Sequence, residues 1–203
     1  IAFAQGPLAP PGAPAPTMKT LQQIEPRTPI AALPYTIPSP GSYYLTTNLT
    51  GVAGQDGITI AASGVTLDLM GFELVGVAGS FYGVFVSGSR TNIAVRNGTV
   101  RDWSGGVGVH TANAVNSQLE RLAVSKNGGI GIYASNSSTV SGCTVQNNAA
   151  AGIYAGSGST ISGCTVQNNA ADGIYAGSGS TISDCTARSN GGHGIVAAGG
   201  STV

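Results

Sequence analysis

The hydrophobic positions in the C-terminal part of the chain recur every 21 residues, as from Ile132 to Ile153 (153 − 132). Within the repeat 152–172, apolar and polar residues alternate in three short runs, separated by turn-like segments at 156–158 and 168–169. Alternation with a period of two is typical of β-strands, whereas a helical face needs apolar residues three and four positions apart. Glycine and asparagine favour turns because they tolerate positive φ. The pattern therefore predicts about three short strands per repeat, joined by corners.

The fixed period also predicts a stack of coils in which identical residues lie above one another. Such coils pair in parallel and in register, with neighbouring strands about 4.8 Å apart. The recurring residues form an isoleucine column (Ile132, Ile153, Ile174, Ile195), a cysteine column (Cys143, Cys164, Cys185) and an asparagine column (Asn148, Asn169, Asn190). We expect the isoleucines and cysteines to point into the core. The asparagine amides are expected to form hydrogen bonds along the stack at a corner.

This Gly-Ile…Asn pattern, as in Gly152-Ile153 followed by Asn169, resembles the right-handed parallel β-helix repeat of pectate-lyase-like proteins. The resemblance covers roughly residues 41–203. It implies an all-β fold, namely a single-stranded right-handed parallel β-helix (β-solenoid) with about 21 residues per coil in the C-terminal part. Because many unrelated functions use this fold, the resemblance implies no single activity.

Proline separates the N-terminal segment from the rest, since all ten prolines lie at or before Pro40. Proline cannot donate a strand hydrogen bond, so continuous pairing is expected only where prolines stop. We predict that residues 1–29 contain a signal-peptide remnant, a proline-rich extended segment and a short capping helix at 17–25. Residues 30–203 are predicted to form the β-helix, with regular repeats at 131–203 that are truncated or uncapped at the last coil.

The start of the chain allows two interpretations. Ala2-Phe3-Ala4 fits the small-residue motif of a signal-peptide cleavage site. The alternative is that residues 1–5 form a strand that pairs with another segment. Under either interpretation, we expect bacterial-type export to an extracellular or cell-surface location.

Coils are predicted to shorten along the stack. The strand starts that match one another are Gly57, Gly83, Gly108 and Gly131, with intervals of 26 (83 − 57), 25 (108 − 83) and 23 (131 − 108) before the regular 21. The longest loops should therefore lie in the N-terminal coils, and long loops are where binding surfaces are usually found.

The low charge of the chain excludes some partners. Only 8% of residues are charged and the formal net charge is zero, whereas binding to nucleic acid needs a basic surface. No apolar run reaches the length of a membrane span. The three cysteines are expected to be reduced core thiols, since thiols in one column do not form the tetrahedron of a metal site. We expect no metal and no cofactor.

Charged residues offer one candidate for catalysis. Asp68, Arg96 and Glu120 fall at equivalent places in successive coils. They could be an acid/base cluster for polysaccharide cleavage, or a column of alternating sign that avoids stacking like charges; we favour the second interpretation. A glycosidase needs a close carboxylate pair, which Asp68 and Glu73 only approximate. We therefore assign no catalytic set, and Asp68, Glu73 and Arg96 are its nearest candidates.

An outward tyrosine column is the best candidate for binding. Tyr133, Tyr154 and Tyr175 recur at the repeat interval. They could form a platform for sugar rings, a packing surface for a neighbouring chain, or a simple cross-strand stack. His110 and His193 are expected to be solvated turn residues.

Two further features stay open. Trp103, in a loop between coils, could complete the core or contact a ligand. An outward threonine column (Thr139, Thr160, Thr181) raises ice binding as an alternative.

The repeats favour a structural function. An active site needs one coil to differ from its neighbours, but here the best-formed coils are the most alike. We therefore expect an extracellular structural or adhesive β-solenoid that self-associates through its uncapped C-terminal coil, end to end, into fibres. The alternatives are a carbohydrate-active enzyme (a polysaccharide lyase or glycosidase) and a passive glycan-binding module, with polysaccharide as the partner.

Overall fold

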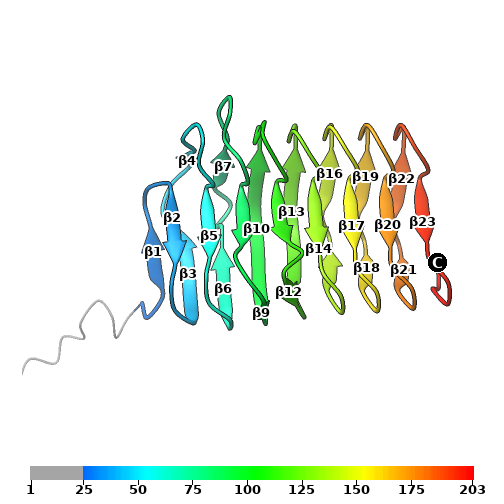
Figure 1. Ribbon diagram of the computed structural model, residues 1–203, viewed down its shortest axis with the longest axis horizontal. Coiled ribbons are helices and arrows are strands. Elements are labelled where there is room, and N and C mark those ends of the chain that lie inside the picture. Colours follow the sequence, from blue (N-terminus) through cyan, green and yellow to red (C-terminus); the bar gives the residue numbers. More distant parts are fainter. Residues whose placement is uncertain (1–24) are drawn as a thin grey trace, which may run out of the picture.

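The computed structural model describes residues 25–203 and shows a parallel β-solenoid whose axis runs from β1 to β23 (Figure 1). All of its paired strands are parallel, and residues 25–203 contain no helix. The predicted all-β solenoid is therefore confirmed. The signal-peptide remnant, the proline-rich segment and all of the expected helix at 17–25 except its last residue lie outside the described residues.

One face of the solenoid is an eight-stranded sheet with one strand from each coil. Its strands, in spatial order, are β2 (Tyr35–Ile37), β5 (Ile58–Ile60), β8 (Val84–Val86), β11 (Val109–Thr111), β14 (Ile132–Ala134), β17 (Ile153–Ala155), β20 (Ile174–Ala176) and β23 (Ile195–Ala197). Ile58 pairs with Val84, 26 residues on (84 − 58), and the interval falls to 21 between Ile132 and Ile153 (153 − 132). The predicted shortening of the coils is confirmed.

A thirteen-stranded sheet forms the rest of the wall. Its main path is β1 (Thr28–Ile30), β3 (Gly41–Leu45), β6 (Val65–Asp68), β10 (Ile93–Arg101), β13 (Gln118–Ser125), β15 (Thr139–Ser141), β18 (Thr160–Ser162) and β21 (Thr181–Ser183). Five further strands are attached to this path. At β10 it is joined by β7 (Glu73–Val75), which pairs in turn with β4 (Leu49–Thr50). At β13 it is joined by β16 (Thr144–Gln146), followed by β19 (Thr165–Gln167) and β22 (Thr186–Arg188). A separate pair joins β9 (Arg90–Thr91) to β12 (Ala114–Val115). Because β1 begins at Thr28, the first paired strand crosses the division predicted between residues 29 and 30.

Corners are made by single residues with left-handed backbone. Asn147 and Asn168, at one corner of successive coils, have φ of 57° and 55°. Asparagine adopts this conformation more readily than most residues, because its short amide bonds locally. Along β10 and β13 the same device turns the strand at Asn97 and Arg121, with φ of 58° and 51°.

Alternate side chains of every strand fill the interior. In β17, Ile153 and Ala155 are fully buried while Tyr154 between them is half-buried. Cys143 and Cys164 are buried, Cys185 is half-buried, and all three are free thiols. Cys143 and Cys164 therefore contribute to the core, while Cys185 is partly open to solvent.

Trp103 belongs to the core. Its side chain is completely buried, and its indole Nε1–H donates to the Leu74 carbonyl at 3.2 Å. A Cβ at Gly51 or Gly57 would lie 2.6 Å from the Trp103 ring, so these glycines leave the space that the indole fills. Of the two possibilities for Trp103, the structure supports the core position.

Candidate binding groove

An aromatic column stands on the outer face of the eight-stranded sheet. Register pairing places Tyr133 beside Tyr154, and Tyr154 beside Tyr175. The ring centroids are 4.8 Å and 4.6 Å apart, respectively. The three tyrosines expected to form a column are therefore adjacent in space, and all three are half-buried.

The column extends further toward the N-terminus than the tyrosines alone indicate. His110 pairs with Tyr133 on one side and with Phe85 on the other, at ring distances of 5.2 Å and 5.4 Å. Tyr82 packs against both Phe85 and His110 at 5.1 Å. We call the five paired rings (Phe85, His110, Tyr133, Tyr154, Tyr175) together with Tyr82 the aromatic column.

The expectation that His110 is a solvated turn residue is wrong. It lies at the centre of β11, and its Nδ1 is buried without a hydrogen-bond partner among the described residues. Burial lowers the pKa of His110, although the Asp56 charge opposes this effect. The signal was present in the sequence, because His110 follows Gly108-Val109 as Tyr133 follows Gly131-Ile132. His193, in contrast, has a side chain that is 82% exposed.

A groove of about 320 Å³ runs beside the aromatic column. Its floor contains Ser135, Gly156 and Gly177, each two residues after a tyrosine. Side chains two apart on a strand share a face, so small residues at these positions leave a channel next to the tall rings. The lining residues are Ala112, Tyr133, Ala134, Ser135, Asn136, Tyr154, Gly156, Ser157, Tyr175, Gly177, Ser178 and Ala198.

The tyrosine rings beside this groove pack against one another. Tyr154 and Tyr175 are stacked with only 10° between their planes, so each covers one face of the other. Tyr133 meets Tyr154 edge to face at 66°. Burial and the neighbouring tyrosines raise the pKa of Tyr154 above its usual value. The column can supply hydroxyl groups and ring surface to a ligand.

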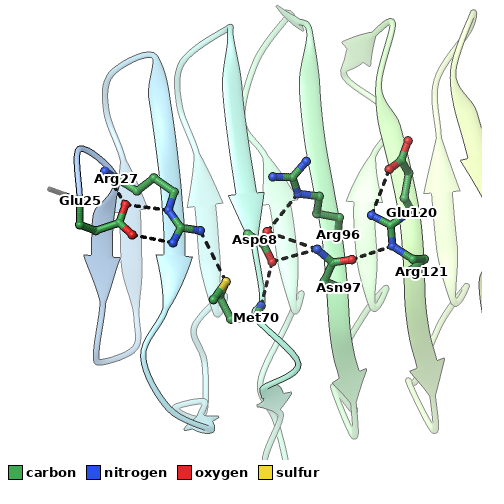
Figure 2. A network of polar contacts seen from close by, with 8 residues as sticks. All are labelled: Glu25, Arg27, Asp68, Met70, Arg96, Asn97, Glu120 and Arg121. Carbon is green, nitrogen blue, oxygen red and sulfur yellow. Dashed lines mark hydrogen bonds and ion pairs between the residues drawn. The ribbon is translucent and has the colours of Figure 1, made fainter.

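Asp68, Arg96 and Glu120 lie elsewhere, in a polar network on the thirteen-stranded sheet (Figure 2). The Asp68 carboxylate, only 9% exposed, accepts hydrogen bonds from Met70 N at 2.9 Å, Arg96 Nε at 3.1 Å and Asn97 Nδ2 at 3.2 Å. Burial raises the pKa of Asp68, but the bonds from Met70, Asn97 and Arg96 outweigh it and hold the pKa below its usual value. The carboxylate is therefore a satisfied ion-pair partner.

Glu73 is similarly occupied. Its carboxylate accepts from Arg101 Nη2 at 2.9 Å, and Arg101 also pairs with Asp102. Arg96 lies in register between Asp68 and Glu120, so charges alternate in sign from coil to coil. The geometry is that of the alternating column, and both carboxylates named as catalytic candidates are neutralised by arginine. Residues 25–203 contain no cluster of three or more histidine, cysteine or acidic side chains able to hold a metal ion.

The asparagine column is one coil longer than expected and is buried at its centre. Asn148 Nδ2 donates to Asn169 Oδ1 at 2.9 Å, and Asn127 Nδ2 donates to Asn148 Oδ1 at the same distance. Asn190 continues the column beyond Asn169. These residues hold a corner together and are not exposed for binding.

No helix long and apolar enough to cross a bilayer occurs in residues 25–203.

Residues 50–203 match the family model described as "Right handed beta helix region". This match covers more than half of the chain, which therefore belongs to the right-handed β-helix family. Among solved structures, the A-module of the Azotobacter vinelandii mannuronan C-5 epimerase AlgE4 is similar in fold, with a TM-score of 0.57 and 15% sequence identity. The match covers 84% of this chain and 64% of that one, so this chain spans less than two thirds of its length. A search of curated proteins found no match.

Proposed function

We propose that this β-helix binds a linear polysaccharide along its axis, in the groove beside the aromatic column. The observation that carries the proposal is the repetition of the groove lining: Tyr154 and Ser157 in one coil are followed by Tyr175 and Ser178 in the next. A lining that repeats from strand to strand suits a ligand that is itself an extended repeating polymer.

The chemistry of the lining fits a ligand rich in hydroxyl groups. Tyrosine and serine hydroxyls both donate and accept hydrogen bonds, and the Asn136 amide adds two donors and an acceptor. Tyrosine rings and the half-buried Ala112 and Ala198 methyl groups supply apolar contact for the C–H surface of a sugar. The A-module of AlgE4 is, by its name, part of an epimerase of the polysaccharide mannuronan, which agrees with this class of ligand.

Replacement of Tyr154 tests the proposal. Tyr154→Ala removes the central ring of the groove and should weaken polysaccharide retention in affinity electrophoresis by roughly tenfold, or about 1.4 kcal/mol. Tyr154→Phe keeps the ring and should lose less, since one hydrogen bond contributes about 0.5–1.5 kcal/mol. Thr160→Ala, on the thirteen-stranded sheet, is the matched control and should bind as the unmodified chain does. Unchanged retention of the Tyr154→Ala variant would remove the groove from consideration.

A structural or adhesive role is the second candidate, favoured by the unbroken asparagine column and the regular coils from Ile132 onward. Self-association through the C-terminal coil stays a prediction, and so does a location outside the cell. Negative-stain microscopy separates filaments from single particles, and fractionation of the producing cell tests export. Monomers at high concentration in light scattering would contradict end-to-end association.

A further inference from the structure

The lining of the groove carries no charged side chain. All of its residues are uncharged, and most are polar or aromatic. An approaching ligand therefore meets neutral polar groups and tyrosine rings.

None of the cations of residues 25–203 lines the groove. The arginines that form ion pairs with carboxylates are Arg27, Arg96, Arg101 and Arg121. Arg188, in β22, donates to Gln167 Oε1 at 2.7 Å, and Lys126 lies at a corner next to β13. Arg90 lies one coil before the groove: its backbone N–H donates to the carbonyl of Asn113, beside the groove residue Ala112, and its Nε is buried without a hydrogen-bond partner among the described residues.

We infer that the groove selects a neutral polysaccharide over a polyuronate; this inference rests on the proposed function. A carboxylate that enters a protein site loses water, and the loss is costly unless a cation or several donors replace it. The lining of the groove holds no cation that could replace this water. Sugar hydroxyls carry no such penalty, because the tyrosine, serine and asparagine groups of the lining can replace their bonds to water.

The test is affinity electrophoresis of the full chain in gels that contain single polymers. The neutral probes are xylan, galactomannan and hydroxyethylcellulose, and the acidic probes are mannuronan and polygalacturonate. We expect at least one neutral polymer to retard the chain, with the retardation reduced roughly tenfold in Tyr154→Ala, and no retardation by either acidic polymer at low salt. Far-UV circular dichroism verifies that each variant is folded.

A charge-introducing variant provides a gain of function. Ser157 is exposed and lines the groove. Ser157→Lys places an ammonium group where the unmodified chain has a hydroxyl, and should create retention on acidic polymers that salt abolishes. Ser162→Lys, which adds the same charge to β18 on the other sheet, is the control for a general charge effect and should not create comparable retention.

The outcomes separate the two proposals. Retention on an acidic polymer that Tyr154→Ala removes would overturn the neutral selectivity and leave the groove as a polysaccharide site. Retention on a neutral polymer that Tyr154→Ala and Tyr154→Phe both leave unchanged would overturn both, because the ligand would then bind elsewhere. Absence of retention on every polymer of both classes would also overturn both.

Discussion

Single residues connect the coils most directly at the asparagine column. The Asn148 side chain is only 2% exposed, and its Oδ1 accepts from both Asn127 N at 3.1 Å and Asn127 Nδ2 at 2.9 Å. Its own Nδ2 donates to Asn169. One amide therefore satisfies polar groups of the coils before and after it, in a region closed to water.

We expect Asn148→Ala to lower the free energy of unfolding by about 2–3 kcal/mol, because buried donors of Asn127 lose their acceptor. Asn190→Ala is the matched control: Asn190 accepts the equivalent bonds from Asn169 at 3.0 Å but is half-buried, so water can replace it and the loss should be about 1 kcal/mol. Urea denaturation followed by circular dichroism measures both. Equal losses in the two variants would show that burial of the column contributes nothing.

His110 predicts a pH dependence of stability. Because burial lowers its pKa in the folded state, the unfolded chain binds a proton at a pH where the folded chain does not. Stability is therefore complete above the ordinary histidine pKa and falls as the pH decreases from about 7 toward the lowered pKa. His110→Phe, which keeps a ring in the aromatic column, should flatten this part of the profile of melting temperature against pH. His193→Gln, at an exposed position, should leave it as it is; a profile that His110→Phe does not alter contradicts the assignment.

Among the elements, the strands from β5 to β23 of the eight-stranded sheet each follow a glycine, and from Gly57 to Gly173 that glycine has no room for a side chain. A Cβ on Gly152 would lie 2.3 Å from Val166 Cγ1 and 2.7 Å from Asn169 Nδ2. At the last coil, a Cβ on Gly194 would come no closer than 3.6 Å to Ala187, which is ordinary contact. The glycine is thus needed for close packing between corner and core.

We expect Gly152→Ala to destabilise the fold by about 1–3 kcal/mol through overpacking. Gly194→Ala should stay within about 0.5 kcal/mol of the unmodified chain. The comparison uses the same substitution at equivalent positions of two coils, and thermal melts of both variants measure it. A Gly152→Ala variant as stable as Gly194→Ala would mean that the corner relaxes freely around the added methyl group.

Strands and their register could be predicted from the sequence because the solenoid repeats its own pattern. The starts at Gly57, Gly83 and Gly108 were recognisable even where the intervals differ. The aromatic column was predicted only in part, since Phe85 and His110 occupy tyrosine positions without being tyrosine. The groove was not predicted, because it depends on how far the side chains of neighbouring columns project from the same face of the sheet. Nor was the burial of Asp68, which depends on the corner geometry at Asn97.

At the scale of the whole molecule, stability arises coil by coil. A solenoid has contacts only between neighbouring coils, so its stability is approximately a sum over coils and the interfaces between them. The coil that begins at Gly152 is flanked by near copies, and Ile132, Ile153 and Ile174 occupy one column. In the regular coils each strand pairs only with the strands before and after it, which means that one interior coil should be dispensable.

Deletion of residues 152–172 removes one complete coil and brings Ile174 beside Ile132, with every later column in register. We expect this shortened chain to fold with the same circular dichroism spectrum and a melting temperature within a few degrees of the original, because it loses one coil and keeps well-matched interfaces.

Deletion of residues 155–174 is the control: it removes one residue fewer and joins Tyr154 to Tyr175 inside a strand. Tyr175 then takes the inward position of Ala155, and Ala176 turns outward, which should cost roughly 2 kcal/mol or more and lower the melting temperature by about 4–8 °C. If both deletions melted together, the columns of identical residues would not be what determines the register of the stack.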